Sequence, residues 1–178
     1  MIPLVTKADL NNYKYVADSV KNSTVWEQFV SEAQEFDIMP WLGDALMDEI
    51  LIQAATDPVS ISAANQALLD GGSYTYQTKT HRFQGLKACI IYYAFARFTN
   101  RTPYNYTATG IVIKDSDLST PVSDKVVQRL ETEARLMGEA IRDRVVLFLS
   151  RNYADYPLWE SRGCVLPGRK VTFHTLGD

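Results

Sequence analysis

Few side chains in this sequence of 178 residues have the types and the spacing that chemistry requires. His81 and Cys89 are eight residues apart, and a cysteine paired with a histidine can act as a nucleophile. Cys89, however, lies in the apolar run of residues 88–96. A thiol in apolar surroundings keeps its proton and is a poor nucleophile. We therefore interpret His81 as a loop histidine and Cys89 as a buried thiol.

The other candidates for chemistry lack the partners that they need. Asp115 and Asp117 form an Asp-x-Asp pair, but the glycine and the later glutamate of a calcium-binding loop do not follow. Ser150 and Ser161 have no recognisable base, and the sequence has no glycine-rich phosphate loop. We therefore predict no catalytic, metal-binding or cofactor-binding residues, and a protein that is not an enzyme and takes no cofactor.

The composition is that of a single globular domain. Hydrophobic residues make up 46% of the chain and charged residues 22%, which argues against disorder. The apolar run at residues 88–96 is too short to span a bilayer, and the first ten residues have no apolar signal core. Two cysteines do not make a disulfide framework. We expect folding in a reducing cytoplasm and no contact with a membrane.

Charge is divided between the body of the chain and its last residues. The whole chain carries −3, whereas residues 161–177 contain three basic residues and no acidic one. The rest of the chain therefore carries −6. An acidic body opposes phosphate binding, which needs clustered lysine and arginine. The basic end suits an acidic partner or a neighbouring copy.

The elements that would position any site are predicted to be helical, and the longest covers residues 123–152. Its apolar residues recur every three or four positions, as one face of a helix requires. At ~1.5 Å per residue such a helix runs roughly 45 Å, more than a small domain needs. The predicted buried stripe consists of Val126, Leu130, Ala134, Met137, Ile141, Val145 and Phe148.

Two shorter helices are predicted near the start of the chain. Thr6 can cap a helix that begins at Lys7, and Ser23 or Thr24 can cap the next one. The side of this second helix predicted to be buried carries Val25, Trp26, Phe29, Val30, Ala33 and Phe36.

Proline and glycine divide the next part of the chain. Pro40 suits the first turn of a helix, and Gly43 within that helix would allow close packing. A break is predicted at residues 57–58, followed by a short helix that stops at Gly71 and Gly72. The residues predicted to face inward after Pro40 are Trp41, Leu42, Ala45, Leu46 and Ile50.

Residues 73–80 alternate like a strand but are polar, so a strand and an ordered loop are both open. Residues 83–98 leave almost no polar face, which predicts a central helix. A short β-branched run, residues 111–113, lies in the turn-rich segment before the long helix. The predicted fold is an all-α helical bundle with one long C-terminal helix and short extended or hairpin-like segments.

The end of the chain is predicted to be an extended arm, residues 161–178, after a helical domain of residues 1–160. Tyr153 and Tyr156 are expected to fold back on the core. A frayed terminus is the alternative for the arm, yet residues 170–175 alternate as an added strand would. The residues predicted to bind a partner are Trp159, Arg162, Arg169, Lys170, Val171 and Phe173.

Seven segments along the chain have a pattern found in a known family. They are PLVTKADL at 3–10, EAQEFDIMPWLG at 32–43, LLDGGSY at 68–74, GLK at 85–87, YAFAR at 93–97, TGIV at 109–112 and PVSD at 121–124. With these segments the chain resembles the small head-to-tail connector (adaptor) proteins of tailed bacteriophages, in particular versions from Bacteroidetes phages and crAss-like phages. The resemblance covers about residues 3–160, and residues beyond Ser161 have no counterpart in it.

The resemblance implies a structural virion protein, made in the host cytoplasm and located at the head–tail junction. Such proteins form a ring, commonly of twelve copies, below the portal protein. The ring extends the DNA channel and receives the next tail component. Genomic DNA would pass through the lumen without specific binding, because an acidic body repels phosphates.

Two alternatives stay open. Another tail-completion or tail-terminator ring protein would usually be a mixed α/β sandwich, whereas strand signals here are sparse. A small helical regulatory protein that binds nucleic acid would need a basic recognition helix. The long helix instead carries acidic and basic residues in near balance.

Overall fold

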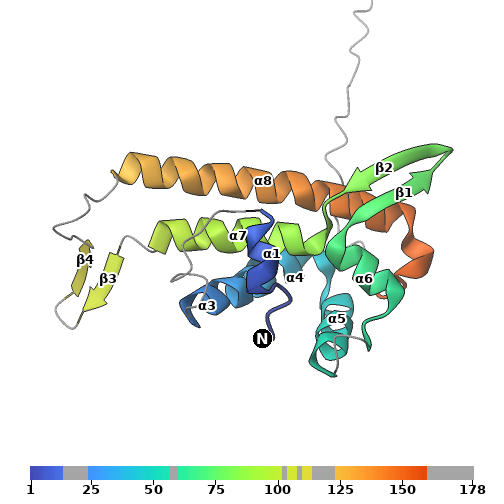
Figure 1. The fold of residues 1–178 in the computed structure, drawn as a ribbon, viewed down its shortest axis with the longest axis horizontal. Helices are drawn as coiled ribbons and strands as arrows, with labels where there is room; N and C mark the ends of the chain where they lie inside the picture. Colours follow the sequence, from blue (N-terminus) through green and yellow to red (C-terminus); the bar gives the residue numbers. More distant parts are fainter. Residues whose placement is uncertain (14–23, 57–59, 102–103, 108–109, 114–122, 160–178) are drawn as a thin grey trace, which may run out of the picture.

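The computed structural model describes residues 1–13, 24–56, 60–101, 104–107, 110–113 and 123–159. Over these residues the protein is mostly α-helical with one long C-terminal helix and short β-hairpins, as predicted (Figure 1). The elements are α1 (Lys7–Asn11), α3 (Thr24–Ala33), the π-helix η1 (Gln34–Ile38), α4 (Met39–Leu42), α5 (Asp44–Thr56), α6 (Ala63–Asp70), β1 (Gly72–Tyr76), β2 (Lys79–Phe83), α7 (Gly85–Arg101), β3 (Tyr104–Thr107), β4 (Gly110–Ile113), α8 (Asp124–Arg151) and the 3-10 turn η3 (Tyr153–Asp155).

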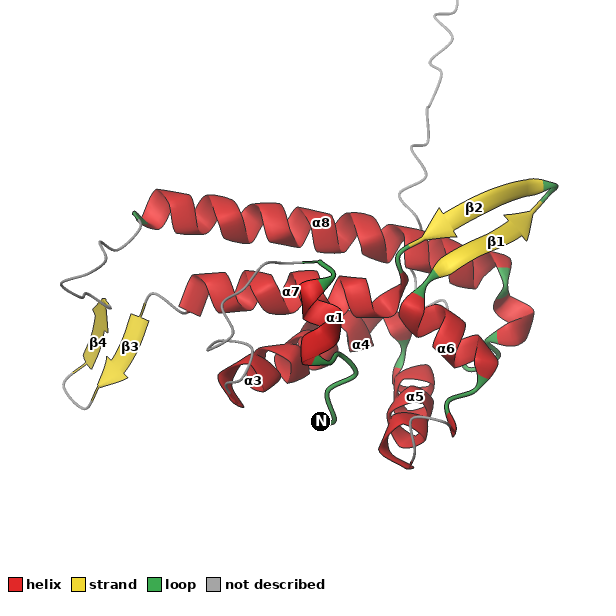
Figure 2. Ribbon diagram, in the orientation of Figure 1, coloured by secondary structure: helices red, strands yellow, loops and turns green. Residues whose placement is uncertain are grey.

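Helix α7 is the centre of the protein. It packs against α8 on one side and against α3, η1 and α6 elsewhere, and Figure 2 shows it between α8 and the α3–α4 segment. Its residues Cys89, Ile90 and Ala94 have no exposed surface. A helix that is apolar on every side must be enclosed. The prediction of a central helix is therefore confirmed, although Phe83 belongs to β2 rather than to the helix.

Helix α8 lies beside α7 along most of its length (Figure 1). It spans Asp124–Arg151, one residue shorter at each end than predicted, and Ala134, Ile141, Val145 and Phe148 of the predicted stripe are buried. Leu130 and Met137 are exposed, and Gly138 is buried against the ring of Tyr93. An added Cβ at Gly138 would lie 3.1 Å from that ring, so glycine lets the two helices approach closely. The buried row runs through Val127, Ala134, Gly138, Ile141, Val145 and Leu149.

The π-helix η1 changes the helical phase after α3. Its Gln34 carbonyl accepts a hydrogen bond from the N–H of Met39, five residues on. The wider turn moves Phe36 away from the buried row of Trp26, Phe29, Val30 and Ala33, and Phe36 is exposed. Val25 is exposed as well, because it lies in the first turn outside that row. The prediction that Val25 and Phe36 are buried is wrong.

Gly43 ends a helix rather than lying inside one. It has φ +90° and closes α4, and an added Cβ would meet nothing within 4 Å. Its role is therefore the positive φ and not close packing. Because the helix restarts at Asp44, its phase is reset, and Ala45 is exposed instead of facing inward. Trp41, Leu42, Leu46 and Ile50 are buried as predicted.

Residues 72–83 form an antiparallel hairpin, so the strand alternative is confirmed. Gly72 pairs with Phe83 and Tyr76 with Lys79. The tip residues Gln77 and Thr78 both have positive φ, as a two-residue hairpin turn requires. The hairpin projects from the body beyond α6 (Figure 2). A second hairpin, β3–β4, joins α7 to α8 and contains the predicted β-branched run.

The base of the first hairpin is closed by two glycines. Gly71 and Gly85 have φ +77° and +81°. An added Cβ on Gly71 would overlap the backbone of Gln84 and Gly85, and one on Gly85 would overlap Gly71 and Leu69. Only glycine fits such an approach of two backbones. Gly71 also ends α6, as predicted.

The two ends of the described chain are held against the core. Thr6 caps α1 as predicted, in a reciprocal capping box with Asp9. Tyr156 is buried, and its hydroxyl donates a 2.6 Å hydrogen bond to the Ala64 carbonyl. Tyr153 is exposed, so only Tyr156 folds back on the core.

Candidate functional site

Within the described part of the chain, Cys89 and His81, the side chains considered for nucleophilic chemistry, do not form a pair. Cys89 is buried in α7, its Sγ donates to the Gly138 carbonyl at 3.4 Å, and burial raises the pKa of the thiol. His81 lies on β2, not in a loop, and stacks on Tyr74 with 5.4 Å between ring centroids. Among the described residues no three His, Cys, Asp or Glu side chains are grouped to hold a metal ion. Asp115 and Asp117 lie outside the described residues.

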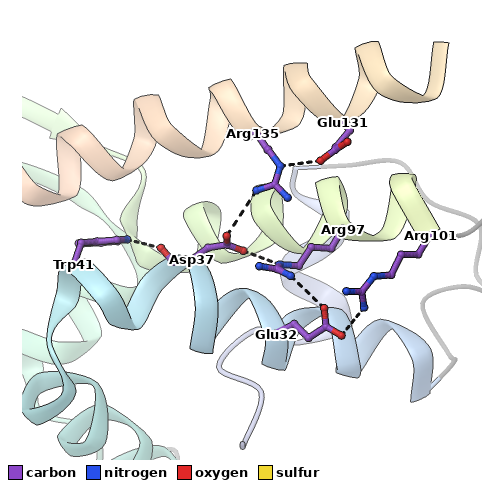
Figure 3. Close-up of polar contacts among 7 residues, drawn as sticks. All are labelled: Glu32, Asp37, Trp41, Arg97, Arg101, Glu131 and Arg135. Atoms are coloured by element: carbon purple, nitrogen blue, oxygen red, sulfur yellow. Dashed lines mark hydrogen bonds and ion pairs between the residues drawn. The ribbon is translucent and has the colours of Figure 1, made fainter. Parts of the chain in front are cut away.

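The main polar cluster joins four helical elements, α3, η1, α7 and α8, as Figure 3 shows. Arg97 of α7 donates to Asp37 of η1 at 2.8 Å and to Glu32 of α3 at 3.3 Å. Arg101 pairs with Glu32 at 2.6 Å. Arg135 of α8 bonds Glu131 at 2.9 Å and lies 3.8 Å from Asp37. The cluster fixes α3, α7 and α8 relative to one another.

Arg97 is the central cation of this cluster. Its side chain is only 15% exposed, and that of Asp37 is 12% exposed. Burial opposes the charge of Arg97, but the hydrogen bonds and charges of Asp37 and Glu32 outweigh it and raise the pKa of Arg97. The guanidinium also lies 5.5 Å from the ring centroid of Phe36. The exposed ring of Phe36 therefore covers a buried ion pair.

The π-helix also anchors the start of the described chain. Gln34 is fully buried, and a buried glutamine needs hydrogen-bond partners for its amide group. Its Oε1 accepts from the N–H of Leu4 at 2.7 Å, and its Nε2 donates to the carbonyl of Ile2 at 2.9 Å. Trp41 Nε1 donates to the Asp37 carbonyl at 2.7 Å. Single π-turns are frequent at functional sites, and here the turn organises both the polar cluster and the N-terminal segment.

Sequence reasoning missed this cluster because charges on helices are usually solvated. One signal was present. Arg97 is a charged residue within the apolar segment 83–98, which is predicted to be the central helix. A cation in such a segment needs an anion from another element. The spacing of Glu32 and Asp37 gives no sign of which element supplies it.

The hairpin β1–β2 is fixed to the end of α8 by aromatic contacts. Phe83 stacks on Phe148 at 4.1 Å, and Tyr74 meets the same ring edge-on at 5.1 Å. Arg151 donates to the Tyr74 hydroxyl at 3.1 Å and lies 4.6 Å above the ring of Tyr76. The hairpin therefore presents a defined surface rather than a loose loop.

The predicted partner-binding residues lie at the end of the chain. Trp159 is half-buried and packs against the hydrophobic core, and its backbone N–H donates to the Tyr156 carbonyl at 3.0 Å. Arg162, Arg169, Lys170, Val171 and Phe173 lie outside the described residues.

The first half of α8 exposes large apolar side chains. Leu136 is 60% exposed, Met137 is 49% exposed, and Leu130, nearly two turns earlier, is 40% exposed. Single exposed apolar residues are common, but three within eight positions of one helix are typical of a contact surface. We call Leu130, Leu136 and Met137 the apolar ridge of α8. No described helix is both long and apolar enough to cross a bilayer.

A family model matches residues 38–167, which is most of the chain and runs from the end of η1 past the end of α8. The chain belongs to a family of unknown function (DUF6712). Its matched region includes α7, the hairpin β1–β2 and the apolar ridge of α8, but not α3. Searches of curated proteins and of solved structures found no match.

Proposed function

We propose that this protein is a structural component of a bacteriophage virion, a connector subunit that forms a ring below the portal. The ring, commonly of twelve copies in the proteins that the sequence resembles, would join head to tail and extend the DNA channel. The next tail component would bind its far side. The protein would be located at the head–tail junction after synthesis in the host cytoplasm.

The apolar ridge of α8 is the observation that supports this proposal best. Leu136 and Met137 are exposed next to each other on the longest helix. A rigid helix with an uncovered apolar surface is suited to packing against another subunit. The cluster around Arg97 supports the same proposal, because it locks the helices into one shape. A ring of identical subunits needs identical rigid parts.

The arm and the charge of the body fit the same arrangement. Residues 161–178 could reach the portal or a neighbouring copy. An acidic body around a channel would let DNA slide without binding its phosphates.

Reconstitution with the portal tests the proposal. A portal protein from the same genome would be co-expressed with this chain, and the purified complex would be imaged by electron microscopy. We expect a closed ring on the portal, with the same density below the portal in purified virions. A portal that stays bare at saturating protein, together with virions that lack the chain, would end the connector proposal.

A matched variant makes the experiment specific. Leu136→Ser with Met137→Ser removes the two most exposed side chains of the apolar ridge without touching the core. We expect the variant to fold with an unchanged helical signal and to bind the portal more weakly. Unchanged binding would show that the ridge does not contribute.

A further inference from the structure

Charge is separated in the sequence in a way that the fold only partly neutralises. Residues 22–78 contain nine acidic residues and no lysine or arginine, whereas residues 71–114 contain six basic residues and no acidic one. Internal ion pairs use some of these charges. Arg97, Arg101 and Lys87 pair with Glu32, Asp37 and Asp70. Among the charges without an ion pair in the described residues, we consider one basic surface and one acidic surface.

The basic surface lies at the base of the hairpin β1–β2. Arg82 of β2 and Arg144 of α8 are both exposed and line a shallow pocket with Ser73 and Gln84. Neither arginine has an ion pair within the described part of the chain. Two guanidinium groups beside a hydroxyl and an amide are suited to carboxylates, which each arginine can bind with two hydrogen bonds. We call these four residues the arginine notch.

The acidic surface lies on α3 and η1. Glu27 and Glu35 are exposed and line an open groove with Pro3, Gln28 and Ser31. Glu32 borders the groove but is occupied by Arg97 and Arg101. Glu27 and Glu35 have no ion pair within the residues that the structure describes. We call this surface the glutamate groove.

The two surfaces lie far apart on one molecule. The hairpin projects at one end of the long axis of the protein, and α3 lies toward the other end on the opposite side of α7 (Figure 1). They therefore cannot neutralise each other within one chain. We propose that the arginine notch of one copy binds the glutamate groove of a second copy. This inference rests on the proposed function, because it supplies the contact between adjacent ring subunits.

Such a contact is heterologous, joining different surfaces of the two copies. Heterologous contacts repeat around an axis and close into a ring when the rotation allows. The contact of one notch with one groove is smaller than the ~1,600 Å² of a typical stable interface, so a single pair should bind weakly. Closure of the ring, or attachment to a portal, would strengthen this contact, because it raises the effective concentration of each surface near its partner.

Disulfide trapping between two differently labelled chains tests the contact without a portal. Both chains carry Cys164→Ser, one carries Ser73→Cys in the notch, and the other carries Gln28→Cys in the groove. A matched control replaces the second chain by one with Ala140→Cys, an exposed position on α8. We expect the notch–groove pair to form mixed dimers about tenfold faster than the control pair, and 0.5 M salt to abolish the difference.

Charge reversal then tests the ion pairs themselves. Arg82→Glu with Arg144→Glu in the first chain should slow trapping about tenfold, and so should Glu27→Lys with Glu35→Lys in the second. The two reversed chains together should restore it. Damage to the fold would not be repaired in this way, since all four side chains are exposed.

The outcomes separate this inference from the proposed function. Trapping no faster than the control, or trapping that charge reversal leaves unchanged, would overturn the notch–groove contact even if a ring forms on the portal. Fast, charge-dependent trapping, combined with a bare portal and virions that lack the chain, would support the contact and reject the connector proposal.

Discussion

The Nε of Arg97 donates a 2.8 Å hydrogen bond to Oδ2 of Asp37 and joins the central helix to the π-helical turn. Both side chains are largely buried, and Asp37 is also approached by Arg135 from α8. A buried ion pair of this kind adds little net stability over an apolar pair, but loss of one partner is costly. Its value here is geometric, because it sets the positions of three helices.

Removal of Arg97 should therefore destabilise the protein more than removal of Arg101. Arg97→Met leaves Asp37 buried without its main cation, and we expect a loss of about 2 kcal/mol in the free energy of unfolding. Arg101→Met is the matched control, since Arg101 shares Glu32 but is 48% exposed, and it should cost about 0–1 kcal/mol. Urea denaturation followed by circular dichroism measures both. Equal losses would contradict a special role for the buried pair.

Alanine at the hairpin base should be harmful, and more so than alanine at Gly43. Gly71→Ala and Gly85→Ala place a Cβ against backbone atoms in addition to the strained φ, so each should cost about 3 kcal/mol. Gly43→Ala adds only the strain, because nothing lies within 4 Å, and should cost about 1 kcal/mol. Thermal unfolding of the three variants ranks them. A Gly43 variant as unstable as the other two would show that overlap of the Cβ with backbone atoms does not cause the larger loss.

Tyr156 should make the stability of the protein sensitive to alkaline pH. Burial, with a smaller contribution from Asp155, raises the pKa of Tyr156 to about 12, above the ordinary value of 10.0. The unfolded state therefore ionises first as pH rises. The stabilisation by Tyr156 is complete below about pH 10 and is lost between about pH 10 and 12.

Tyr156→Phe isolates this effect. The variant loses the hydrogen bond to Ala64 and should be less stable by about 1 kcal/mol at pH 7. The difference between wild type and variant should shrink as pH rises above 10, because phenylalanine does not titrate. Urea midpoints at pH 7, 9 and 11 measure it. A constant difference across this range would show that the hydroxyl titrates normally.

The arm should be dispensable for folding but needed for attachment. Deletion of residues 161–178 keeps Tyr156 and Trp159, which pack on the core, so the free energy of unfolding should change by less than about 0.5 kcal/mol. Attachment to a neighbour or a portal should weaken. Burial of Val171 and Phe173 would contribute roughly 3–5 kcal/mol before ordering costs.

Two further variants separate the apolar contribution of the arm to binding from its charged contribution. Val171→Ser with Phe173→Ser should weaken portal binding at any salt concentration. Neutral glutamines at Arg162, Arg169 and Lys170 should weaken it only at low salt, since exposed charges are screened. Unfolding of the truncated chain would place the arm in the core, and undiminished binding would refute the arm hypothesis.

The sequence was most informative where one local rule decided the outcome. The long helix was predicted to within one residue at each end, because its period is regular and Ser123 precedes it. Gly71 was predicted as a helix end because a glycine after an apolar helix commonly takes positive φ. The buried state of Cys89 followed from its apolar neighbours.

The errors arose where tertiary contacts outweighed the local pattern. The predicted stripe of α8 was drawn through its large apolar residues, whereas the contact with α7 uses Gly138, which carries no side chain. The π-turn after Ala33 shifts the helical phase by one residue, and no residue type in the sequence predicts such a turn. The ion pair of Arg97 depends on residues 60 positions away, which no local pattern can reveal.

The closed base of the first hairpin has a consequence for how much the length of the hairpin can change. The chain leaves the helical body at Gly71 and returns at Gly85, where the two backbones touch. Residues 72–84 therefore form a closed loop whose two ends lie against each other. Lengthening such a loop costs little, because loop entropy grows only with the logarithm of length. The hairpin can thus be replaced by a longer or different segment, which would change the outer surface while the helical core stays the same.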